Sequence, residues 1–568
     1  MKKEKIIKKK DFLKLPPNLK DYEKTYRHFS WQEAEKEISW FPKKRLNAAY
    51  NAIDRHLDTP RKNKIALYWE GENGEEEKYT FYDLYLLSNQ FGNFLKSLGV
   101  KKGDRVFFFL PRIPCLYWGF LGALKIGAIP GTLFSAFGPQ ALFDRLNNSQ
   151  AKVLITTKEL YQRVRKIEKQ LPYLKKIVFA ENIRNLLSKY SSSLKLRRMA
   201  PQEPAFILYT SGTTGKPKGV VHTHKAIVLE HITAKWVLDI KEEDTYWCTA
   251  DPGWVTGIAY GILGVWSNGA SSLVYEGRFD PEKWYRLIEK YRISVWYTAP
   301  TAIRMLAAQG LKLVRKFNLS SLRHLASVGE PLNPEPVWWG LKAFNLPLHD
   351  TWWQTETGGI LIANFPCLDI KPGSMGKPIP GIKANIVDDK GRVLPIKQMG
   401  NLAIKPPWPS MMKTIWRRPK KYQSYFVNGW YITGDLAYKD EDGYFWFVGR
   451  ADDVIKTSGE RVGPFEVESC LIEHPAVVEA GVIGKPDPVR GEIIKAFVVL
   501  KPGWRPTNAL KEKLQLHVKK NLAGHAYPRE IEFVKSLPKT RSGKIVRRIL
   551  KAQELGLPIG DTSSLEEF

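Results

Sequence analysis

The sequence predicts an α/β protein with a large N-terminal body of several subdomains, built from mixed sheets and helices, and a small α+β C-terminal domain. Three observations lead to this prediction. The chain has 568 residues, which exceeds the ~100–200 residues of one ordinary domain. Strand-like apolar runs alternate with helical segments over much of the chain. The pattern of apolar and polar residues changes near residues 449–454.

The alternation favours parallel strands joined by crossover helices. Strand-like runs are expected at residues 105–110, 152–157, 204–210 and 292–298, and helices at residues 116–125, 141–148 and 300–317. We therefore expect an α/β body over residues 1–450.

The remaining residues, 451–568, are about one small domain long. They contain a helical segment at residues 466–474 and a strand-like run at residues 493–500. These elements predict a compact α+β domain. The basic tail formed by the first ten residues, and the last few residues, are expected to be mobile.

The composition is that of a folded protein, with 43% hydrophobic and 26% charged residues. Lys and Arg exceed Asp and Glu by 88 − 58 = +30, which would attract polyanions such as nucleic acid, acidic membranes or phosphorylated small molecules. The basic residues beyond the tail are spread between acidic ones, and no nucleic-acid-binding motif accompanies them. A solvated basic surface is therefore favoured over a nucleic-acid-binding protein.

The sequence favours a cytoplasmic location. No apolar segment of the signal-peptide type follows the charged N-terminus. The longest apolar stretch, residues 106–134, is interrupted by Arg112, Pro114 and Lys125, so no membrane span is predicted. The four cysteines are widely scattered, as expected for buried thiols in a reducing compartment.

The most informative segment is residues 209–224 (YTSGTTGKPKGVVHTH). Glycines let backbone N–H groups approach an anion, hydroxyls donate hydrogen bonds, and Lys216 and Lys218 add positive charge. It is not a Walker A loop, because too few residues separate the glycines and Pro217 opposes a helix after Lys216. Composition alone is equally compatible with an ordinary turn. The candidate phosphate-binding residues are Thr210, Ser211, Gly212, Thr213, Thr214, Gly215 and Lys216.

This loop resembles the signature of the adenylate-forming superfamily, which includes acyl-CoA synthetases, luciferases and peptide-synthetase adenylation domains. Further signatures follow in that family's order at residues 350–359 (DTWWQTETGG), 431–450, 453–468 and 538–548 (PKTRSGKIVRR). Segments between them resemble acetyl-CoA synthetases of the shorter bacterial type. The resemblance covers nearly the whole chain and implies an AMP-forming acetate–CoA ligase that makes acetyl-CoA, AMP and diphosphate from acetate, ATP and CoA through an enzyme-bound acetyl-adenylate.

The resemblance also implies roles for individual residues in adenylation. Lys544 would contact the carboxylate and the α-phosphate, and Glu356 would hold Mg²⁺ with help from Thr213 and Thr355. Asp435 would accept hydrogen bonds from the ribose, and Arg450 and Arg461 would contact nucleotide oxygens. The strip along adenine and the α-phosphate would comprise Gly329, Glu330, Pro331, Asp350, Thr351, Trp352, Trp353, Gln354 and Thr355.

The second half-reaction would require the C-terminal domain to rotate about a hinge at Asp452. Ser458, Gly459 and Thr256 would then line the CoA tunnel, and Lys519 would lie near the CoA phosphates. His474, with backbone oxygens of Ile472 and Val477, matches a second magnesium site in relatives, although a helix-terminal histidine explains it equally well. A lysine acetyltransferase and a deacetylase that act on Lys544 are implied as partners, because acetylation removes the charge.

The substrate is expected to be acetate. Trp353 matches an indole that shortens the acyl pocket in acetate-specific relatives, and Val255, Thr256 and Val328 match its other walls. Propionate would be a weaker substrate, because one methylene is worth only about 1–3 kcal/mol in an apolar pocket. Trp353 disfavours a medium-chain acyl-CoA synthetase. A peptide-synthetase-like domain is disfavoured because no carrier domain is found after it, so it would need a carrier encoded elsewhere.

Overall fold

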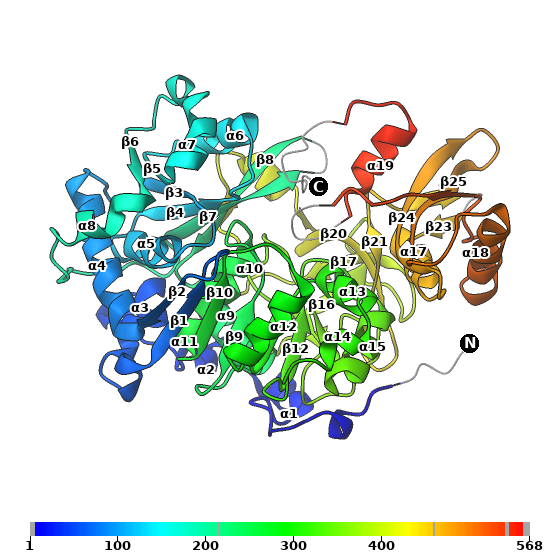
Figure 1. The fold of residues 1–568 in the computed structure, drawn as a ribbon, viewed down its shortest axis with the longest axis horizontal. Helices are drawn as coiled ribbons and strands as arrows, with labels where there is room; N and C mark the ends of the chain where they lie inside the picture. The colour runs from blue at the N-terminus through cyan, green and yellow to red at the C-terminus, as the bar shows by residue number, and fades with distance from the viewer. Residues whose placement is uncertain (1–5, 213–214, 458–459, 540–544, 560–568) are drawn as a thin grey trace.

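The computed structural model describes residues 6–212, 215–457, 460–539 and 545–559. It confirms the predicted fold class, a large α/β body of mixed sheets and helices followed by a smaller C-terminal domain. In Figure 1 the C-terminal domain lies at one end of the molecule, and helices α4 (Phe81–Ser97) and α8 (Ile183–Leu187) lie at the other.

One sheet of the body has the strand order β18-β8-β7-β4-β3-β5-β6. Its strands are β3 (Arg105–Phe109), β4 (Ile129–Leu133), β5 (Val153–Thr156), β6 (Lys176–Phe179), β7 (Pro204–Gly212), β8 (Gly215–Thr223) and β18 (Thr414–Ile415). Strands β4, β3, β5 and β6 pair in parallel. The near-continuous apolar sequence of β3, β4 and β5 is what a sheet covered on both faces requires. Strands β3 and β5 confirm the strand predictions at residues 105–110 and 152–157.

Helices α5 (Pro114–Lys125), α6 (Pro139–Ser149) and α7 (Lys158–Arg165) connect the strands of this sheet, and α4 precedes β3. Helix α4 begins with a capping box, in which Thr80 and Asp83 each accept a hydrogen bond from the other's backbone N–H. Helix α5 is buried along its whole length, as its continuously apolar sequence predicts.

The second sheet has the order β15-β14-β13-β12-β11-β9-β10-β1-β2. Its strands are β1 (Ile65–Glu70), β2 (Glu76–Thr80), β9 (Thr245–Cys248), β10 (Ser271–Tyr275), β11 (Val295–Thr298), β12 (His324–Ser327), β13 (Leu348–Trp352), β14 (Ile362–Ala363) and β15 (Lys377–Pro378). Strands β9 to β13 run parallel in the centre. The carboxyl ends of β11, β12 and β13 therefore meet at one edge, where α/β sheets bind ligands.

Helices α12 (Pro281–Lys290), α13 (Pro300–Ala308), α14 (Leu311–Val314) and α15 (Pro334–Phe344) accompany this sheet. The single helix predicted over residues 300–317 is wrong. The structure divides it into α13 and α14 at Gly310, whose φ of +76° lies in the left-handed region. A glycine reaches this conformation without a Cβ clash, so the chain ends one helix and begins another there.

The body ends with a largely antiparallel sheet and the C-terminal domain contains another. The first consists of β16 (Ala384–Val387), β17 (Gly400–Ile404), β19 (Phe426–Val427), β20 (Trp430–Lys439) and β21 (Phe445–Arg450). The second consists of β22 (Ile455–Thr457), β23 (Glu460–Val462), β24 (Val477–Asp487), β25 (Gly491–Leu500) and β26 (Glu530–Phe533), with helices α17 (Pro464–Ile472), α18 (Asn508–Asn521) and α19 (Arg547–Glu554). The helix and strand predicted at residues 466–474 and 493–500 are confirmed.

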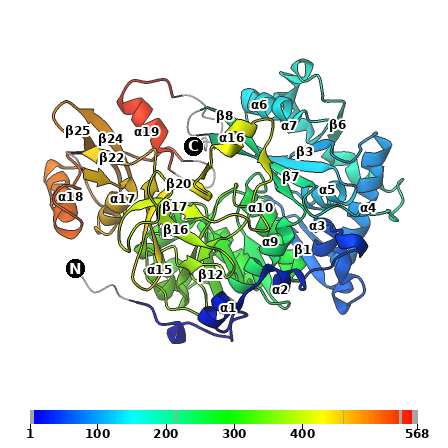
Figure 2. The ribbon, with the colours of Figure 1, turned by 180° about the vertical axis from the view of Figure 1, so that it is seen from behind.

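The start of the chain is anchored to the body from residue 7 onward, so the prediction of a mobile tail is wrong for residues 7–10. Ile7 pairs with Ile370 in a β-bridge, and Phe12 packs edge-on against His349 at 5.3 Å. Figure 2 shows this segment and α1 (Tyr22–His28) along one rim of the body. Apolar anchors within a basic run explain the attachment, because their burial offsets the loss of chain entropy.

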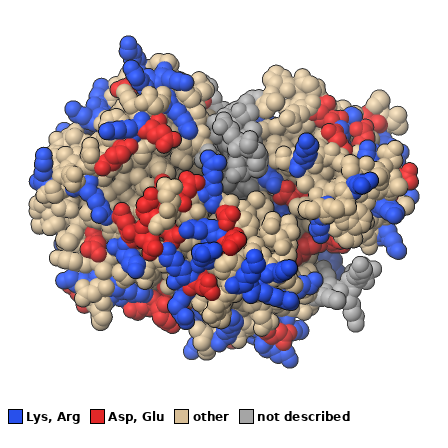
Figure 3. All heavy atoms as spheres, in the orientation of Figure 1, with Lys and Arg blue, Asp and Glu red and all other residues tan. Residues whose placement is uncertain are grey.

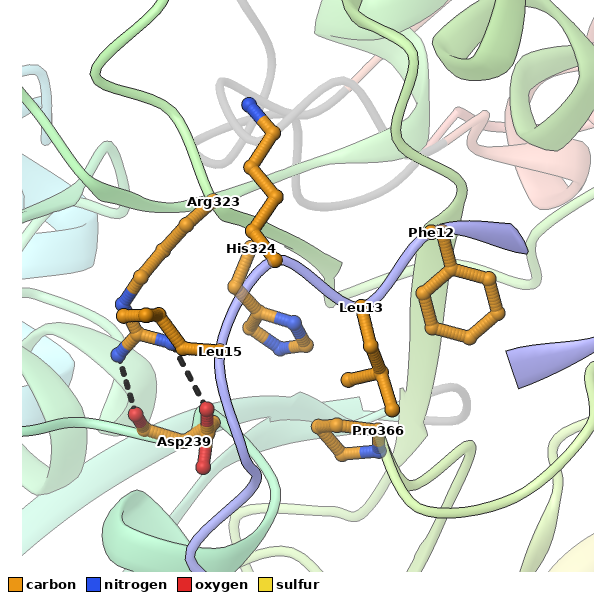
Figure 4. A pocket seen from close by; sticks show the side chains of 8 residues that line it. Phe12, Leu13, Leu15, Asp239, Arg323, His324 and Pro366 are labelled. Atoms are coloured by element: carbon orange, nitrogen blue, oxygen red, sulfur yellow. Dashed lines mark hydrogen bonds and ion pairs between the residues drawn. The ribbon is translucent and has the colours of Figure 1, made fainter. Parts of the chain in front are cut away.

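A small pocket lies where residues 12–15 cross the body (Figure 4). Arg323 forms an ion pair with Asp239 there, at 2.7 Å, and His324 and Pro366 complete the wall. The Asp239 carboxylate also accepts a hydrogen bond from the backbone N–H of Asn18 at 2.7 Å. The pocket is therefore part of the attachment of the N-terminal segment.

The surface in Figure 3 carries Lys and Arg interspersed with Asp and Glu over the face that is drawn. Among the described residues, we find no helix whose length and apolar character would let it span a membrane. The four cysteines are free thiols, and Cys115, Cys367 and Cys470 are buried, which agrees with the interpretation of buried thiols.

Glu230 is a fully buried acid in helix α9 (Ala226–Trp236). Neither carboxyl oxygen has a hydrogen-bond partner among the described residues, and burial raises the pKa of Glu230 well above its ordinary value of 4.5. The folded protein therefore holds the neutral acid, whereas the unfolded chain releases the proton above about pH 4.5. Stability falls as the pH rises from that value toward the raised pKa.

Replacing Glu230 with methionine is expected to raise the thermal unfolding midpoint, and to raise it more at pH 8 than at pH 5. The unpaired carboxyl costs about 1–3 kcal/mol, and the cost grows with pH because folding must take up a proton. Thermal unfolding at both pH values measures the effect. The exposed Glu512 of α18 provides the control substitution, Glu512→Met. An equal gain at both pH values, or a loss, would contradict the assignment of a neutral buried acid.

Candidate functional site

The predicted phosphate loop connects the antiparallel strands β7 and β8, as the flanking apolar runs predict. Thr210 lies in β7, and its hydroxyl oxygen is buried with no hydrogen-bond partner among the described residues. The backbones of Ser211 and Gly212 extend β7, and those of Gly215 and Lys216 begin β8. Buried hydroxyls without partners are uncommon, so Thr210 has capacity to bond a ligand oxygen. Thr213 and Thr214 lie outside the described residues.

Glu356 lies beside this hairpin. Its carboxylate is 3.5 Å from Lys218 Nζ and accepts a hydrogen bond from the Tyr425 hydroxyl at 3.3 Å. Lys218 in turn donates to the Tyr425 hydroxyl at 2.6 Å. The Glu356 side chain is 12% exposed, so the carboxylate is held in place and still accessible. One accessible carboxylate next to a phosphate loop fits Mg²⁺, which takes one or two carboxylates plus phosphate oxygens.

Asp435 joins residues from three segments of the body. It pairs with Arg450 across strands β20 and β21, and its Oδ1 lies 2.8 Å from Arg450 Nη1. Its Oδ2 accepts hydrogen bonds from Trp352 Nε1 and Gln354 Nε2, each at 3.0 Å. Burial alone would lower the pKa of Arg450, but Asp435 and Asp452 raise it. The structure thus brings together four of the predicted nucleotide-binding residues.

Asp350 and Thr351 lie near the carboxyl end of β13, with Gly329 and Pro331 in the loop after β12. Asp350 Oδ1 accepts hydrogen bonds from Ser327 Oγ and the backbone N–H of Thr351, both at 3.0 Å. Burial raises the pKa of Asp350 to about 7, and these hydrogen bonds oppose the rise. These residues meet at the sheet edge where a ligand is expected.

The Glu330 carboxylate is directed toward the body rather than left free. It accepts a hydrogen bond from the backbone N–H of Thr301 at 2.9 Å and forms an ion pair with the buried Arg304 at 2.7 Å. A carboxylate with two such partners is held in place. The side chain of Glu330 therefore shapes the loop of residues 329–331, and its backbone remains as the part able to contact a nucleotide.

The predicted acyl-pocket residues come from three separate elements. Val255 and Thr256 begin the short helix α10 (Val255–Ile258), Val328 follows β12, and Trp353 follows β13. Val255, Thr256 and Val328 are buried, and Trp353 is partly buried. The Trp353 indole N–H donates to the Tyr297 hydroxyl at 3.2 Å, and its ring packs edge-on against Tyr260 at 5.1 Å. The contacts that hold the Trp353 side chain in place are therefore made by buried residues.

The predicted site residues at and after the end of the body do not lie together. Asp452 lies in an exposed turn between β21 and β22, 3.6 Å from Arg450 Nε. Arg461 lies in β23, and its backbone pairs with Lys456. Lys519 is on α18, at the far end of the C-terminal domain from β8 in Figures 1 and 2. Its Nζ lies over the Tyr527 ring at 5.7 Å. The structure does not bring Lys519 to the nucleotide residues.

His474 ends the α17 region, with Ile472 before it and Val477 at the start of β24. Its Nδ1 accepts a hydrogen bond from the backbone N–H of Ala476 at 3.2 Å, and its ring packs edge-on against His517 at 5.5 Å. Across the described residues, no group of three or more His, Cys, Asp or Glu side chains is placed to hold a metal. A site that combines one histidine with backbone oxygens is not of that kind and stays a prediction.

Three further predictions fall outside the described residues: Lys544 and the pair Ser458 and Gly459. Their flanking residues are described. Arg547, three residues after Lys544, donates from Nε to Glu468 at 2.8 Å. Lys539 pairs with Ile545 in an isolated β-bridge. Lys539 Nζ also donates to the Glu479 carboxylate at 2.7 Å, so the described residues on both sides of positions 540–544 contact the rest of the C-terminal domain.

Sequence reasoning missed several side chains of the site. Tyr425 bonds Glu356, Tyr431 donates to Gln354 Oε1 at 3.0 Å, and Tyr260 and Tyr297 contact Trp353. Tyr431 opens the motif at residues 431–450, which offered a signal. Tyr297 lies in a predicted strand, where an aromatic residue is ordinarily part of the core. Tyr260 and Tyr425 had no local signal.

Comparison with known families assigns most of the chain. Residues 53–416 match the model of the AMP-binding enzymes, and residues 466–544 match that of the AMP-binding enzyme C-terminal domain. The chain is similar to an acetyl-coenzyme A synthetase of Bacillus subtilis, with 59% identity over 97% of this chain and 98% of the relative. It is also similar to an acetyl-coenzyme A synthetase of Methanothrix thermoacetophila, with 44% identity over 93% and 86%.

Two solved structures share the fold. A Brucella canis acyl-CoA synthetase matches with a TM-score of 0.74 and 35% identity, over 95% of this chain and 99% of that one. An anthranilate CoA ligase in complex with anthranoyl-AMP matches with a TM-score of 0.84 and 31% identity, over 93% and 99%. The chain therefore belongs to the AMP-binding enzymes and, within them, to the acetyl-coenzyme A synthetase family.

Proposed function

We propose that this AMP-forming acetate–CoA ligase works in two half-reactions. In the first, an acetate oxygen attacks the α-phosphorus of ATP, acetyl-adenylate forms and diphosphate leaves. In the second, the CoA thiol loses its proton and attacks the acetyl carbonyl carbon, and the bond to AMP breaks. ATP and CoA are substrates, and the reaction yields acetyl-CoA, AMP and diphosphate. We place it in the cytoplasm, with neither nucleic acid nor membrane as a partner.

One observation carries this proposal: the segment of residues 352–356 directs successive side chains to three places. Trp352 and Gln354 bond Asp435, Trp353 bonds Tyr297, and Glu356 lies beside the phosphate hairpin. These contacts support a proposal in which the ribose acceptor, the acyl pocket and the phosphate site are adjacent. Such positioning supplies much of the catalysis in transfer to phosphorus, because attacking and leaving atoms must be held in line.

In this proposal, the phosphate oxygens lie along the hairpin between β7 and β8. Thr210 to Lys216 donate hydrogen bonds and charge, and Arg450 and Arg461 contact nucleotide oxygens. Glu356 holds Mg²⁺, with Thr213 and Thr355 nearby, and the ion supplies charge to neutralise the phosphates when bound. Lys544 stabilises the charge that develops on the oxygens at the reacting phosphorus. His474 with backbone oxygens of Ile472 and Val477 forms the second magnesium site.

We further propose that residues 1–450 and 451–568 are separate domains and that the second rotates about Asp452 between half-reactions. The exposed position of Asp452 between β21 and β22 supports a hinge, because exposed residues between elements absorb backbone rotation at little cost. After rotation, Ser458, Gly459 and Thr256 line the path of the CoA thiol. Lys519 then contributes charge near the CoA phosphates, without the bidentate geometry of arginine.

Exchange of labelled diphosphate into ATP, compared across acetate, propionate, butyrate and octanoate, tests the function. We expect strong exchange with acetate in the absence of CoA, exchange lower by about 10–200-fold with propionate, and progressively less with the longer acids. Omission of CoA separates adenylation from thioester formation. Greater exchange with octanoate than with acetate would contradict the acetate pocket, and absence of exchange with every acid would contradict adenylation.

A further inference from the structure

A buried chain of hydrogen bonds holds the Trp353 indole in place. The Trp353 indole N–H donates to the Tyr297 hydroxyl at 3.2 Å, and the Tyr297 and Thr351 hydroxyls are 2.7 Å apart. Thr351 Oγ1 donates to the Ser327 carbonyl at 2.7 Å. An indole can only donate and a carbonyl can only accept, so each hydroxyl accepts one bond and donates the next. The chain ends at the residue before Val328, which ties two pocket walls together.

A second chain with the same logic holds Tyr260. The backbone N–H of Ile360 donates to the Tyr260 hydroxyl at 2.7 Å, which lies 2.7 Å from Thr233 Oγ1. Thr233 Oγ1 donates to the Leu229 carbonyl at 2.7 Å. Tyr260 must therefore donate to Thr233. Both chains use all the hydroxyl protons, so neither tyrosine can rotate without breaking two hydrogen bonds.

The two tyrosines and Trp353 pack as one aromatic group. Tyr260 lies edge-on to Trp353, with ring centroids 5.1 Å apart, and edge-on to Tyr297 at 5.9 Å. Both tyrosines are fully buried, whereas Trp353 is only partly buried. Tyr260 lies in the π-helix η7 (Ala259–Leu263), which directly follows α10 with Val255 and Thr256. π-Helices are rare and frequently occur at functional sites.

We propose that Tyr297 and Tyr260 are positioning residues that set the acyl-chain limit by holding the Trp353 indole. This inference rests on the proposed function, in which Trp353 closes the acyl pocket. A wall excludes a longer acid only if it resists displacement, because a side chain free to change rotamer would yield to an extra methylene. The hydroxyl of Tyr297 supplies that resistance through one directed hydrogen bond, and the ring of Tyr260 supplies it through packing.

The test measures kcat/KM for acetate, propionate and butyrate in full-length enzyme. Tyr297→Phe removes one oxygen and keeps the ring. We expect its propionate-to-acetate ratio of kcat/KM to rise roughly five- to twentyfold, which is part of the ~10–200-fold that one methylene is worth. Tyr260→Phe breaks the second chain and is expected to raise the ratio less, because the ring contact remains. Trp353→Gly removes the wall itself and should give the largest rise.

Tyr285→Phe is the matched control. Tyr285 is fully buried in α12, in a separate hydrophobic cluster, so this variant loses a buried hydroxyl with no expected change in the ratio. The double variant Trp353→Gly/Tyr297→Phe should match Trp353→Gly, because Tyr297 acts only through the indole.

The outcomes separate the inference from the function on which it rests. If Trp353→Gly broadens the substrate range and both Tyr→Phe variants keep the wild-type ratio, the positioning role is wrong while the acyl pocket stands. If Tyr297→Phe does not fold, the propionate-to-acetate ratio of kcat/KM in Tyr260→Phe tests the positioning role: a raised ratio supports it and a wild-type ratio contradicts it. If Trp353→Gly itself leaves the ratio unchanged, the pocket assignment and the inference are both overturned.

Discussion

Replacing Asp435 with alanine is expected to raise the KM for ATP by at least about 100-fold and to change the KM for acetate much less. In the proposed site, Asp435 accepts hydrogen bonds from the ribose hydroxyls, and hydrogen bonds to a charged group contribute about 1.5–3 kcal/mol each. The substitution also leaves Arg450, Trp352 and Gln354 without their shared acceptor. Acetate-dependent diphosphate exchange at varied ATP concentration measures the effect.

Glu441→Ala provides the control for Asp435. Glu441 is a carboxylate in the turn of the same β20–β21 hairpin, 72% exposed and paired with Lys397, so its loss should leave both KM values unchanged. Thermal unfolding shows whether the Asp435 variant is folded. A folded Asp435→Ala enzyme with the wild-type KM for ATP would exclude this carboxylate from nucleotide binding.

Replacing Lys544 with alanine is expected to reduce acetate-dependent diphosphate exchange by at least about 100-fold, as loss of one group that stabilises developing charge does. Thioester formation from supplied acetyl-adenylate and CoA should remain largely intact, because in our proposal Lys544 acts only in adenylation. The two half-reactions are measured separately, exchange without CoA and acetyl-CoA formation from the adenylate without ATP.

Lys551→Ala is the matched control for Lys544. Lys551 is a lysine of α19, 45% exposed and paired with Glu492, so its loss should affect neither half-reaction. Equal loss of both half-reactions in Lys544→Ala would refute the assigned role. The same charge argument predicts that an acetyltransferase acting on Lys544 inactivates adenylation and that a deacetylase restores it. Full activity of enzyme acetylated at Lys544 would contradict that regulation.

The sequence predicted most of the architecture because its signals are local. Runs such as residues 105–110 predict a buried strand from a few neighbouring side chains, and the change of pattern near residue 450 coincides with the end of β21 at Arg450. Ordered motifs indicated the family. The two errors also have local causes: Gly310 divides a helix through its left-handed backbone, and Ile7 and Phe12 anchor a segment that is otherwise basic.

The motifs likewise indicated which residues could form the site, and the structure brings together Trp352, Gln354, Asp435 and Arg450. Partners at long range were not predictable. The Glu330 carboxylate is paired with Arg304, and Glu356 is held by Tyr425. No spacing in the sequence encodes such pairs, because their members are 26 and 69 residues apart along the chain and meet only when it folds.

By itself, the sequence determined the fold class, the family and the chemical character of the site, since each depends on residue types in local order. Only the tertiary structure decided what holds Trp353. In the sequence, Tyr297 is an aromatic residue of a predicted strand and Tyr260 has no local signal. Their proposed role arises when η7 and β11 pack against the end of β13. The direction of each hydrogen bond is then set by donors and acceptors from distant segments, which only folding places together.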